Sequence, residues 1–359
     1  MKPRVRTLVL FGLGAVALAA TAAAGLFAWA QRTVTTPFPP AGVGLPQRVD
    51  IEPGQSAATI LEKLETAGIV PRADLARLVL LRLGDPPLQA GEYLFEHPAT
   101  SREVIGRLVS GDVVQHFVTV LEGLTLEETA ALLAAEGFGD QEAFVAAMRR
   151  PELIADLDSA AETLEGYLFP DTYAFPRGTS EVRIVEEMVA NFRRRFAAGV
   201  VARTGAAADV RATVTLASIV EREATLDSER PVIAGVYANR LRLGIGLYAD
   251  PTVIYALKQQ GVWDGNLRRR DLELDSPYNT YRYPGLPPGP ICSPGSASLQ
   301  AAASPAAVPY LYFVSRNDGS HVFAETLAEH NRNVEIWQRR YFRERARRDA
   351  AESQVPPAD

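Results

Sequence analysis

Val49–Ile69 reads VDIEPGQSAATILEKLETAGI, and Val118–Phe138 reads VTVLEGLTLEETAALLAAEGF. Each stretch predicts a short alternating strand, a turn at a glycine and an amphipathic helix that ends near a second glycine. In the second stretch, Thr125 and Glu128 have the spacing of a capping box, which marks the start of a helix. Because a strand and a helix follow each other in both copies, the sequence predicts an α+β fold.

The first copy of the repeat continues with a helical stretch at Ala73–Leu83 and a strand at Gly91–Phe95. The order strand–helix–helix–strand is the layout of LysM, a small module that binds glycans. We therefore predict a LysM-like module over residues 48–117, and the alternative is another small α+β module. The second copy begins a further strand–helix module, which we predict over residues 118–160.

The N-terminal region is strongly apolar. Leu8–Ala30 reads LVLFGLGAVALAATAAAGLFAWA and contains no charged residue. A helix needs about 20 such residues to cross a bilayer core, so this segment predicts a single transmembrane helix. Lys2, Arg4 and Arg6 precede it, and the positive-inside rule then places residues 1–7 in the cytoplasm and the rest outside the inner membrane. The alternative is a cleaved signal peptide, although its apolar core is usually shorter.

Composition excludes several classes of function. The chain has 359 residues and a formal net charge of -6, which argues against nucleic acid as its partner. Cys292 is the single cysteine, so an internal disulfide cannot form. The four histidines show none of the spacings typical of metal ligands, and we expect no metal or other cofactor.

One predicted helix carries a candidate catalytic residue. Val210–Leu226 reads VRATVTLASIVEREATL, and at about 100° per residue its apolar stripe includes Ala212, Leu216, Ile219 and Val220. Glu223 falls in the middle of that stripe, whereas Glu221 and Arg222 fall well away from it. A partly buried carboxyl has a raised pKa and can act as a general acid. The alternative is a structural ion pair between Glu223 and an arginine in the core.

Polar and aromatic residues gather after this helix. Asn239 is followed by Asp250-Pro251-Thr252 within apolar flanks, where polar groups need partners. Farther along, Asn279 and three tyrosines, Tyr278, Tyr281 and Tyr283, lie close together in the sequence. Sugars are bound by aromatic faces together with planar polar side chains, so these residues favour a sugar site. The alternative is a rigid loop rich in proline and glycine.

These residues belong to longer motifs that carry a family resemblance. The motifs are EGYLFPDTY (Glu165–Tyr173), LASIVEREA (Leu216–Ala224), ER…IAGVYANRLRLGI (Glu229–Ile245), DPTVIY (Asp250–Tyr255), SPYNTY…GLPPGPI (Ser276–Ile291), PGSASLQAA (Pro294–Ala302) and YLYFV…HVF…T…EHN (Tyr310–Asn331). In these segments the chain resembles the MltG (YceG-like) family of endolytic murein transglycosylases, from the N-terminal anchor to about Trp337. The second glutamate of the VEKET-like motif of that family, its catalytic residue, falls on Glu223.

The chain departs from the family pattern at three places. Ala224 stands where similar enzymes have a small polar residue, Leu-Tyr-Ala precedes the DPT motif where the family often has Gln, and Cys292-Ser293 replaces a small residue and Asn. The first departure removes a hydroxyl neighbour that could orient Glu223. None of the three removes the acid.

The resemblance implies cleavage of the β-1,4 bond between N-acetylmuramic acid (MurNAc) and N-acetylglucosamine (GlcNAc) without water. Glu223 protonates the leaving oxygen, and its carboxylate then takes the proton of the sugar's 6-hydroxyl, which attacks the anomeric carbon and leaves a 1,6-anhydro ring. The N-acetyl group of the substrate is expected to assist. The residues expected to hold sugar or to fix Glu223 are Glu165, Asp171, Asn239, Asp250, Thr252, Asn279 and Tyr281, and Glu221 is the fallback acid.

The predicted domains follow from these assignments. They are a cytoplasmic tail (1–7), a transmembrane helix (8–30), a linker rich in proline and glycine (31–47), the two small modules (48–117 and 118–160), a mixed α/β catalytic domain (161–340) and a charged, disordered tail (341–359). The apolar N-terminal segment predicts the inner membrane as a partner. The resemblance implies peptidoglycan strands as the substrate and peptidoglycan synthases (penicillin-binding proteins) as partners, beside which the enzyme would end nascent strands.

Two other functions stay open at this point. The first is a hydrolytic muramidase that uses Glu223 together with Glu165 or Asp171, since hydrolases of this kind use two carboxylates. The second is a membrane-anchored scaffold that binds peptidoglycan without cleaving it.

Overall fold

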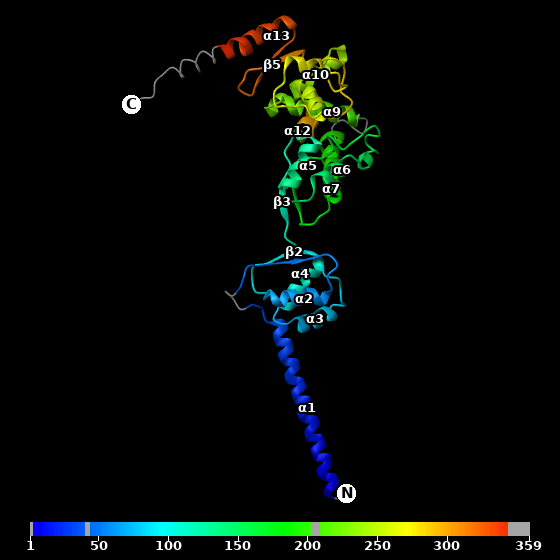
Figure 1. The fold of residues 1–359 in the computed structure, drawn as a ribbon, viewed down its shortest axis with the longest axis vertical. Helices are drawn as coiled ribbons and strands as arrows, with labels where there is room; N and C mark the ends of the chain where they lie inside the picture. The colour runs from blue at the N-terminus through cyan, green and yellow to red at the C-terminus, as the bar shows by residue number, and fades with distance from the viewer. Residues whose placement is uncertain (1–2, 40–43, 203–208, 344–359) are drawn as a thin grey trace, which may run out of the picture. The chain divides into compact units, whose positions relative to one another are not determined.

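The structure is a computed structural model that describes residues 3–39, 44–202 and 209–343. The chain divides into two compact units (Figure 1). The N-terminal unit runs to Phe117 and includes Ala174–Gly178, and the C-terminal unit contains Val118–Tyr173 and the residues from Thr179 onwards. Helices are combined with small two-stranded sheets, β1–β2, β3–β4 and β5–β6, so the predicted α+β class is confirmed.

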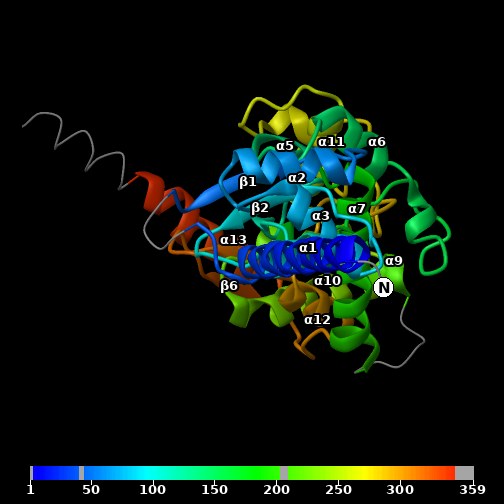
Figure 2. The same cartoon turned by 90° about the horizontal axis from the view of Figure 1, so that it is seen from below.

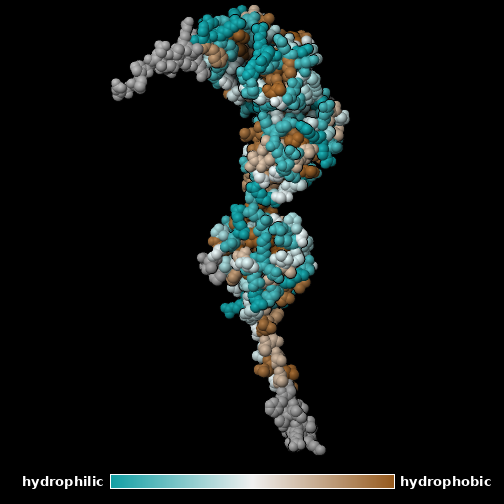
Figure 3. Space-filling model, in the orientation of Figure 1, coloured by the Kyte–Doolittle hydropathy of each residue, from teal (hydrophilic) through white to brown (hydrophobic). Residues whose placement is uncertain are grey.

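The first helix is long and apolar. Helix α1 (Pro3–Thr35) contains a candidate membrane span, Leu13–Thr35, with a mean hydropathy of 1.8 and none of its most apolar window buried. Its exposed side chains are mostly hydrophobic (brown in Figure 3). The helix is compatible with a membrane anchor or a signal sequence, and it continues to Thr35, so the first residues of the predicted linker are helical.

The remainder of the N-terminal unit contains β1 (Gln47–Ile51), α2 (Ala57–Thr66), α3 (Ala73–Arg82), β2 (Gly91–Phe95) and α4 (Ser101–Ser110). Strands β1 and β2 pair antiparallel with Val49 opposite Tyr93, and α2 packs beside β1 (Figure 2). Alternate strand residues, Val49 and Ile51, join Leu61 and Tyr93 in the core. The predicted strand–helix–helix–strand order is confirmed, and the LysM-like identity of this unit stays a prediction.

The C-terminal unit begins with the second copy of the repeat. Its helices α5 (Leu126–Ala135), α6 (Gln141–Met148) and α7 (Glu181–Phe196) accompany strands β3 (His116–Thr119) and β4 (Thr172–Phe175), which both cross the boundary between the units. The predicted capping box is confirmed, because the Glu128 N–H donates to Thr125 Oγ1 at 3.2 Å and the Thr125 N–H donates to the Glu128 carboxylate at 2.9 Å.

Four helices form the centre of this unit. They are α9 (Val210–Glu223), α10 (Arg230–Leu243), α11 (Asp250–Gln259) and α12 (Ser296–Ala303), and α9 contacts the other three. The predicted packing of the apolar stripe of α9 is confirmed at Leu216, Ile219 and Val220, which are buried, but burial is not confined to that stripe. Thr215, Ala217 and Ser218 lie off that stripe and are buried, whereas Ala212 is partly exposed. Since neighbours surround α9, burial by itself does not single out Glu223.

The chain closes with a hairpin and a helix. Strands β5 (Tyr312–Ser315) and β6 (His321–Ala324) pair antiparallel, and α13 (Leu327–Val334) follows them. A π-helical turn at Glu335–Arg340 continues this helix. Most of the predicted disordered tail, residues 344–359, lies outside the described residues.

Candidate active site

Glu223 is the last residue of α9 and is half-buried. Its carboxyl accepts a hydrogen bond from the Tyr237 hydroxyl at 3.1 Å. Burial raises the pKa of Glu223 to about 7, and the negative charge of Asp250 adds to this rise. The Tyr237 hydrogen bond and the Arg240 charge act in the opposite direction. Near neutral pH, the protonated and ionised forms of Glu223 are therefore both populated.

Helix α10 supplies two of these neighbours from one face, since Tyr237 and Arg240 are three residues apart. The Tyr237 ring is buried and meets Phe313 edge to face at 5.8 Å. Arg240 is also buried, and its guanidinium donates to the carbonyl of Leu311 at 2.7 Å and lies 5.5 Å from the centre of the Tyr312 ring. Arg240 is thus a fixed cation beside the candidate acid.

Asp250 and Tyr281 form the next part of the site. Asp250 is the exposed first residue of α11, and it accepts a hydrogen bond from the Tyr281 hydroxyl at 2.6 Å. Burial and this hydrogen bond raise the pKa of Tyr281, and the charge of Glu223 contributes. The Tyr281 ring lies 5.5 Å from that of the exposed Tyr248. The structure thus brings together three residues predicted from the sequence: Glu223, Asp250 and Tyr281.

Asn239 and Thr252, also predicted to serve the site, bind backbone. The Asn239 amide donates to the carbonyls of Val308 at 2.8 Å and Tyr310 at 3.1 Å. The buried Thr252 hydroxyl donates to the Ala249 carbonyl at 2.7 Å. Both side chains hold the segments that carry the site residues.

Asn279 is bound in the same way. Its buried amide donates to the carbonyls of Leu272 at 2.9 Å and Leu274 at 2.7 Å, and its oxygen accepts the Tyr281 N–H at 3.0 Å. Asn279 therefore positions Tyr281 through the backbone.

Glu165 lies in a different environment from Glu223. The Glu165 carboxyl is buried, both its oxygens lie 3.1 Å from the Leu126 nitrogen that donates to them, and the Tyr255 hydroxyl donates to it at 3.3 Å. Burial raises the pKa of Glu165 to about 8, and the nearby Glu127 and Glu128 charges add to the rise.

Asp171 is held by hydrogen bonds from Asn191 at 3.1 Å and Arg195 at 2.9 Å. Burial acts to raise the pKa of Asp171, but the hydrogen bonds from these two side chains and from the Thr172 N–H outweigh it, so the pKa is lowered. Neither Asp171 nor Glu165 is among the groups that shift the pKa of Glu223.

Glu221, the fallback acid, forms a buried ion pair. Its carboxylate lies 2.8 Å from the Arg230 guanidinium and accepts the Gly295 N–H at 2.9 Å. Only 5% of the Glu221 side chain and 8% of the Arg230 side chain are exposed. Within the described residues, Glu223 forms no such ion pair.

The sequence reasoning missed three neighbours of the site: Tyr237, Arg240 and Tyr248. The signal for the first two was present, because VYANR places a tyrosine and an arginine on one face of a helix. Tyr237 also supplies the hydroxyl that Ala224 lacks. Across residues 3–39, 44–202 and 209–343, no cluster of three or more histidine, cysteine or acidic side chains could hold a metal ion.

The motifs and this geometry agree with the comparisons with known proteins. The model of the YceG-like family matches residues 49–336. The chain belongs to the YceG-like family. The family membership predicted from the sequence motifs is thereby confirmed.

Relatives within the YceG-like family carry a functional name. An endolytic murein transglycosylase of Bacillus subtilis (strain 168) is 33% identical over 303 residues, which cover 80% of this chain and 83% of the relative. One of Streptococcus pneumoniae serotype 2 (strain D39 / NCTC 7466) is 29% identical and matches over 57% of its own length. These relatives are lytic transglycosylases, a class of lyase.

A solved structure of the YceG-like family agrees with the fold. The 2.6 Å crystal structure of a yceG-like protein from Listeria monocytogenes has a TM-score of 0.55 and 33% identity to this chain. The match covers 80% of this chain and 98% of the crystallised one.

Proposed function

We propose that this chain is an endolytic murein transglycosylase that cleaves MurNAc-β-1,4-GlcNAc bonds and leaves 1,6-anhydroMurNAc ends. The observation that carries the proposal is the setting of Glu223, which ends α9 half-buried and accepts a hydrogen bond from the Tyr237 hydroxyl at 3.1 Å, with its pKa raised by burial to about 7. A carboxyl with this pKa is a good proton donor in one step and a good acceptor in the next. Relatives whose matches cover 80% of this chain are named for this activity.

In the proposed reaction, protonated Glu223 gives its proton to the glycosidic oxygen as the bond to the anomeric carbon breaks. The Glu223 carboxylate then accepts the proton of the MurNAc 6-hydroxyl, whose oxygen bonds to the anomeric carbon and closes the anhydro ring. The nucleophile belongs to the substrate itself, so proximity favours its attack over that of water. The fixed Arg240 cation and the Tyr237 hydroxyl stabilise the carboxylate between the two steps.

A hydrolytic muramidase is the competing function. Glu165 and Asp171, the carboxylates first considered for it, are bound to other groups, which weakens that version. Asp250 is the acidic group whose charge reaches Glu223, and as a second carboxylate it would activate water. The two functions differ in product mass, since hydrolysis adds water to the new reducing end and transglycosylation does not.

The deciding experiment digests purified sacculi with the wild-type chain and with Glu223→Gln, and analyses the products by mass spectrometry. We expect anhydro ends from the wild type and a loss of at least about a hundredfold in rate for the variant. Glu142→Gln, at an exposed position in α6, is the matched control and should retain full activity. Hydrated ends, or full activity of Glu223→Gln, would refute the proposal.

We further propose that α1 anchors the enzyme in the inner membrane, with the catalytic domain outside the cytoplasm and beside peptidoglycan synthases whose nascent strands it ends. The apolar helix and the basic residues before it support this orientation. Protease added to intact spheroplasts should degrade the C-terminal unit, and crosslinking followed by capture of the anchored chain should recover a synthase. Protection of that unit from the protease would contradict the proposed orientation. Capture without a synthase would contradict the proposed partner.

A further inference from the structure

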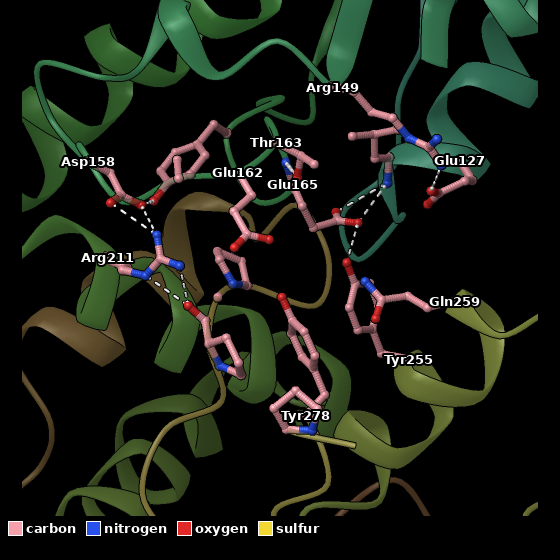
Figure 4. A pocket seen from close by; sticks show the side chains of 17 residues that line it. Glu127, Arg149, Asp158, Glu162, Thr163, Glu165, Arg211, Tyr255, Gln259 and Tyr278 are labelled. Atoms are coloured by element: carbon pink, nitrogen blue, oxygen red, sulfur yellow. Dashed lines mark hydrogen bonds and ion pairs between the residues drawn. The ribbon is translucent and has the colours of Figure 1, made fainter. Parts of the chain in front are cut away.

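A cavity lies within the C-terminal unit, and its lining does not include Glu223. Its volume is about 470 Å³, which is within the usual range for sites that bind small ligands. Glu165, Tyr255 and Tyr278 point into it from three different segments, and the labelled ion pairs lie on opposite sides of it (Figure 4). The reaction described above uses none of these residues.

The cations of this cavity are already paired. Arg211 lies 2.9 Å from Asp158 and donates to the Pro288 carbonyl at 2.8 Å, and Arg149 lies 3.5 Å from Glu127. Glu162 is exposed and also lines the cavity. Because its arginines are neutralised and a further carboxylate lies among them, the cavity disfavours an anionic ligand.

The remaining lining groups suit an uncharged sugar. The Tyr255 and Tyr278 rings lie 4.9 Å apart, and three prolines, Pro277, Pro288 and Pro290, add flat apolar surface. The Gln259 amide can both donate and accept hydrogen bonds. Glu165, whose pKa is raised to about 8 by burial, is mostly a neutral carboxylic acid at neutral pH and can also bond without charge.

The same two helices reach both this cavity and Glu223. In α9, Arg211 lines the cavity and Glu223 ends the helix; in α11, Gln259 lines the cavity and Asp250 begins the helix. At 1.5 Å per residue, the two ends are about 18 Å apart along α9 and about 14 Å apart along α11.

A small hollow shares one lining residue with the larger cavity. Its lining includes Arg222, next to Glu223, and Pro251, next to Asp250. Tyr255 lines both this hollow and the larger cavity. Tyr255 therefore lies on the side of the cavity nearer to the helix ends that carry Glu223 and Asp250.

We infer that the cavity is a distal glycan subsite, which holds an uncharged GlcNAc unit of the same strand that Glu223 cleaves, several sugars from the scissile bond. This inference rests on the proposed function. GlcNAc is preferred over MurNAc because MurNAc carries a lactyl carboxylate or an acidic stem peptide. The subsite makes the enzyme favour long strands, since a short fragment cannot reach both the cavity and Glu223.

The test fills the cavity from its exposed rim. Gln259→Trp places a large side chain at the exposed end of α11, and Gln260→Trp is the matched control one residue later, outside the lining. Ala161→Trp fills the cavity from a different segment, so the result does not depend on the folding of one variant alone. Each is made in the full chain with Glu223→Gln, in detergent, and its binding of a GlcNAc hexamer is measured by calorimetry.

We expect both filling variants to bind the hexamer at least about tenfold more weakly than the Glu223→Gln parent, and the Gln260→Trp chain to bind it as the parent does. In chains that keep Glu223, Gln259→Trp should raise KM for long strands and leave kcat unchanged. Equal hexamer binding by all chains, or tighter binding of an isolated stem peptide than of the hexamer at this cavity, would overturn the inference. Neither result affects the proposed function, which depends on the loss of cleavage in Glu223→Gln.

Discussion

Replacing Tyr237 by phenylalanine tests how Glu223 is tuned. The Tyr237 hydroxyl donates to the Glu223 carboxyl at 3.1 Å and lowers its pKa, against the larger effect of burial. Tyr237→Phe removes this hydroxyl and keeps the buried ring beside Phe313. The pKa of Glu223 should therefore rise above its present value of about 7.

The size of the effect follows from the hydrogen bond. A hydrogen bond to a charged group contributes about 1.5–3 kcal/mol, and one pH unit corresponds to about 1.4 kcal/mol. The loss of this stabilising energy is partly offset because the ionised form of Glu223 still faces Arg240. We therefore expect a displacement of about one pH unit.

The assay is the pH dependence of kcat/KM for release of anhydro ends from sacculi. Protonated Glu223 is required for the first step, so activity falls as pH rises through its pKa. In Tyr237→Phe this alkaline limb should move to higher pH by about one unit. Tyr255→Phe removes the corresponding hydroxyl at Glu165 and should leave the limb in place. An unmoved limb in Tyr237→Phe, or one displaced to lower pH, would refute the assignment of Glu223 as the acid tuned by Tyr237.

Three further predictions concern stability. The pKa of Glu165 is raised from 4.5 to about 8, so its neutral form stabilises the fold fully below about pH 4.5, and this contribution is lost as pH rises to about 8. The resulting fall in the free energy of unfolding is on the order of 5 kcal/mol. Glu165→Gln should flatten it, as measured by urea unfolding at a series of pH values. Arg230→Met leaves Glu221 buried without its cation and should cost about 3–5 kcal/mol in urea unfolding, whereas Arg343→Met at an exposed pair should cost less than about 1 kcal/mol. Gly166 has φ +84° and an added Cβ would clash with Pro290, so Gly166→Ala should lower the melting temperature more than Gly178→Ala, where φ is +79° and the space is open.

The sequence predicted the helices and strands better than it predicted which of their side chains are buried. The repeat, its Thr125–Glu128 capping box and the helix that carries Glu223 depend on local spacing, which periodicity and capping rules describe directly. Burial in α9 extends beyond the predicted stripe because periodicity assumes a surface helix, and three helices packed around α9 bury residues off its apolar stripe.

The partners of the polar residues could not be predicted for a related reason. Asn239, Thr252 and Asn279 have side chains that bind sugars as readily as they bind carbonyls, and only the tertiary structure shows that they bind backbone. Tyr237 meets Glu223 because α10 packs against α9, and that contact depends on tertiary packing that the local sequence does not specify.

The contrast between Glu221 and Glu223 explains how one helix end can hold both a structural and a chemical carboxyl. Two residues apart on a helix, their side chains point about 200° away from each other. Glu221 therefore meets the Arg230 guanidinium at 2.8 Å in a buried pair, whereas Glu223 accepts its hydrogen bond from the neutral Tyr237 hydroxyl. The C-terminal end of α9 carries the negative end of the helix dipole, which further disfavours the ionised form of Glu223. Exchanging these partners, so that a second cation besides Arg240 bonds directly to the Glu223 carboxyl, would lower its pKa further and remove the proton that the first step requires.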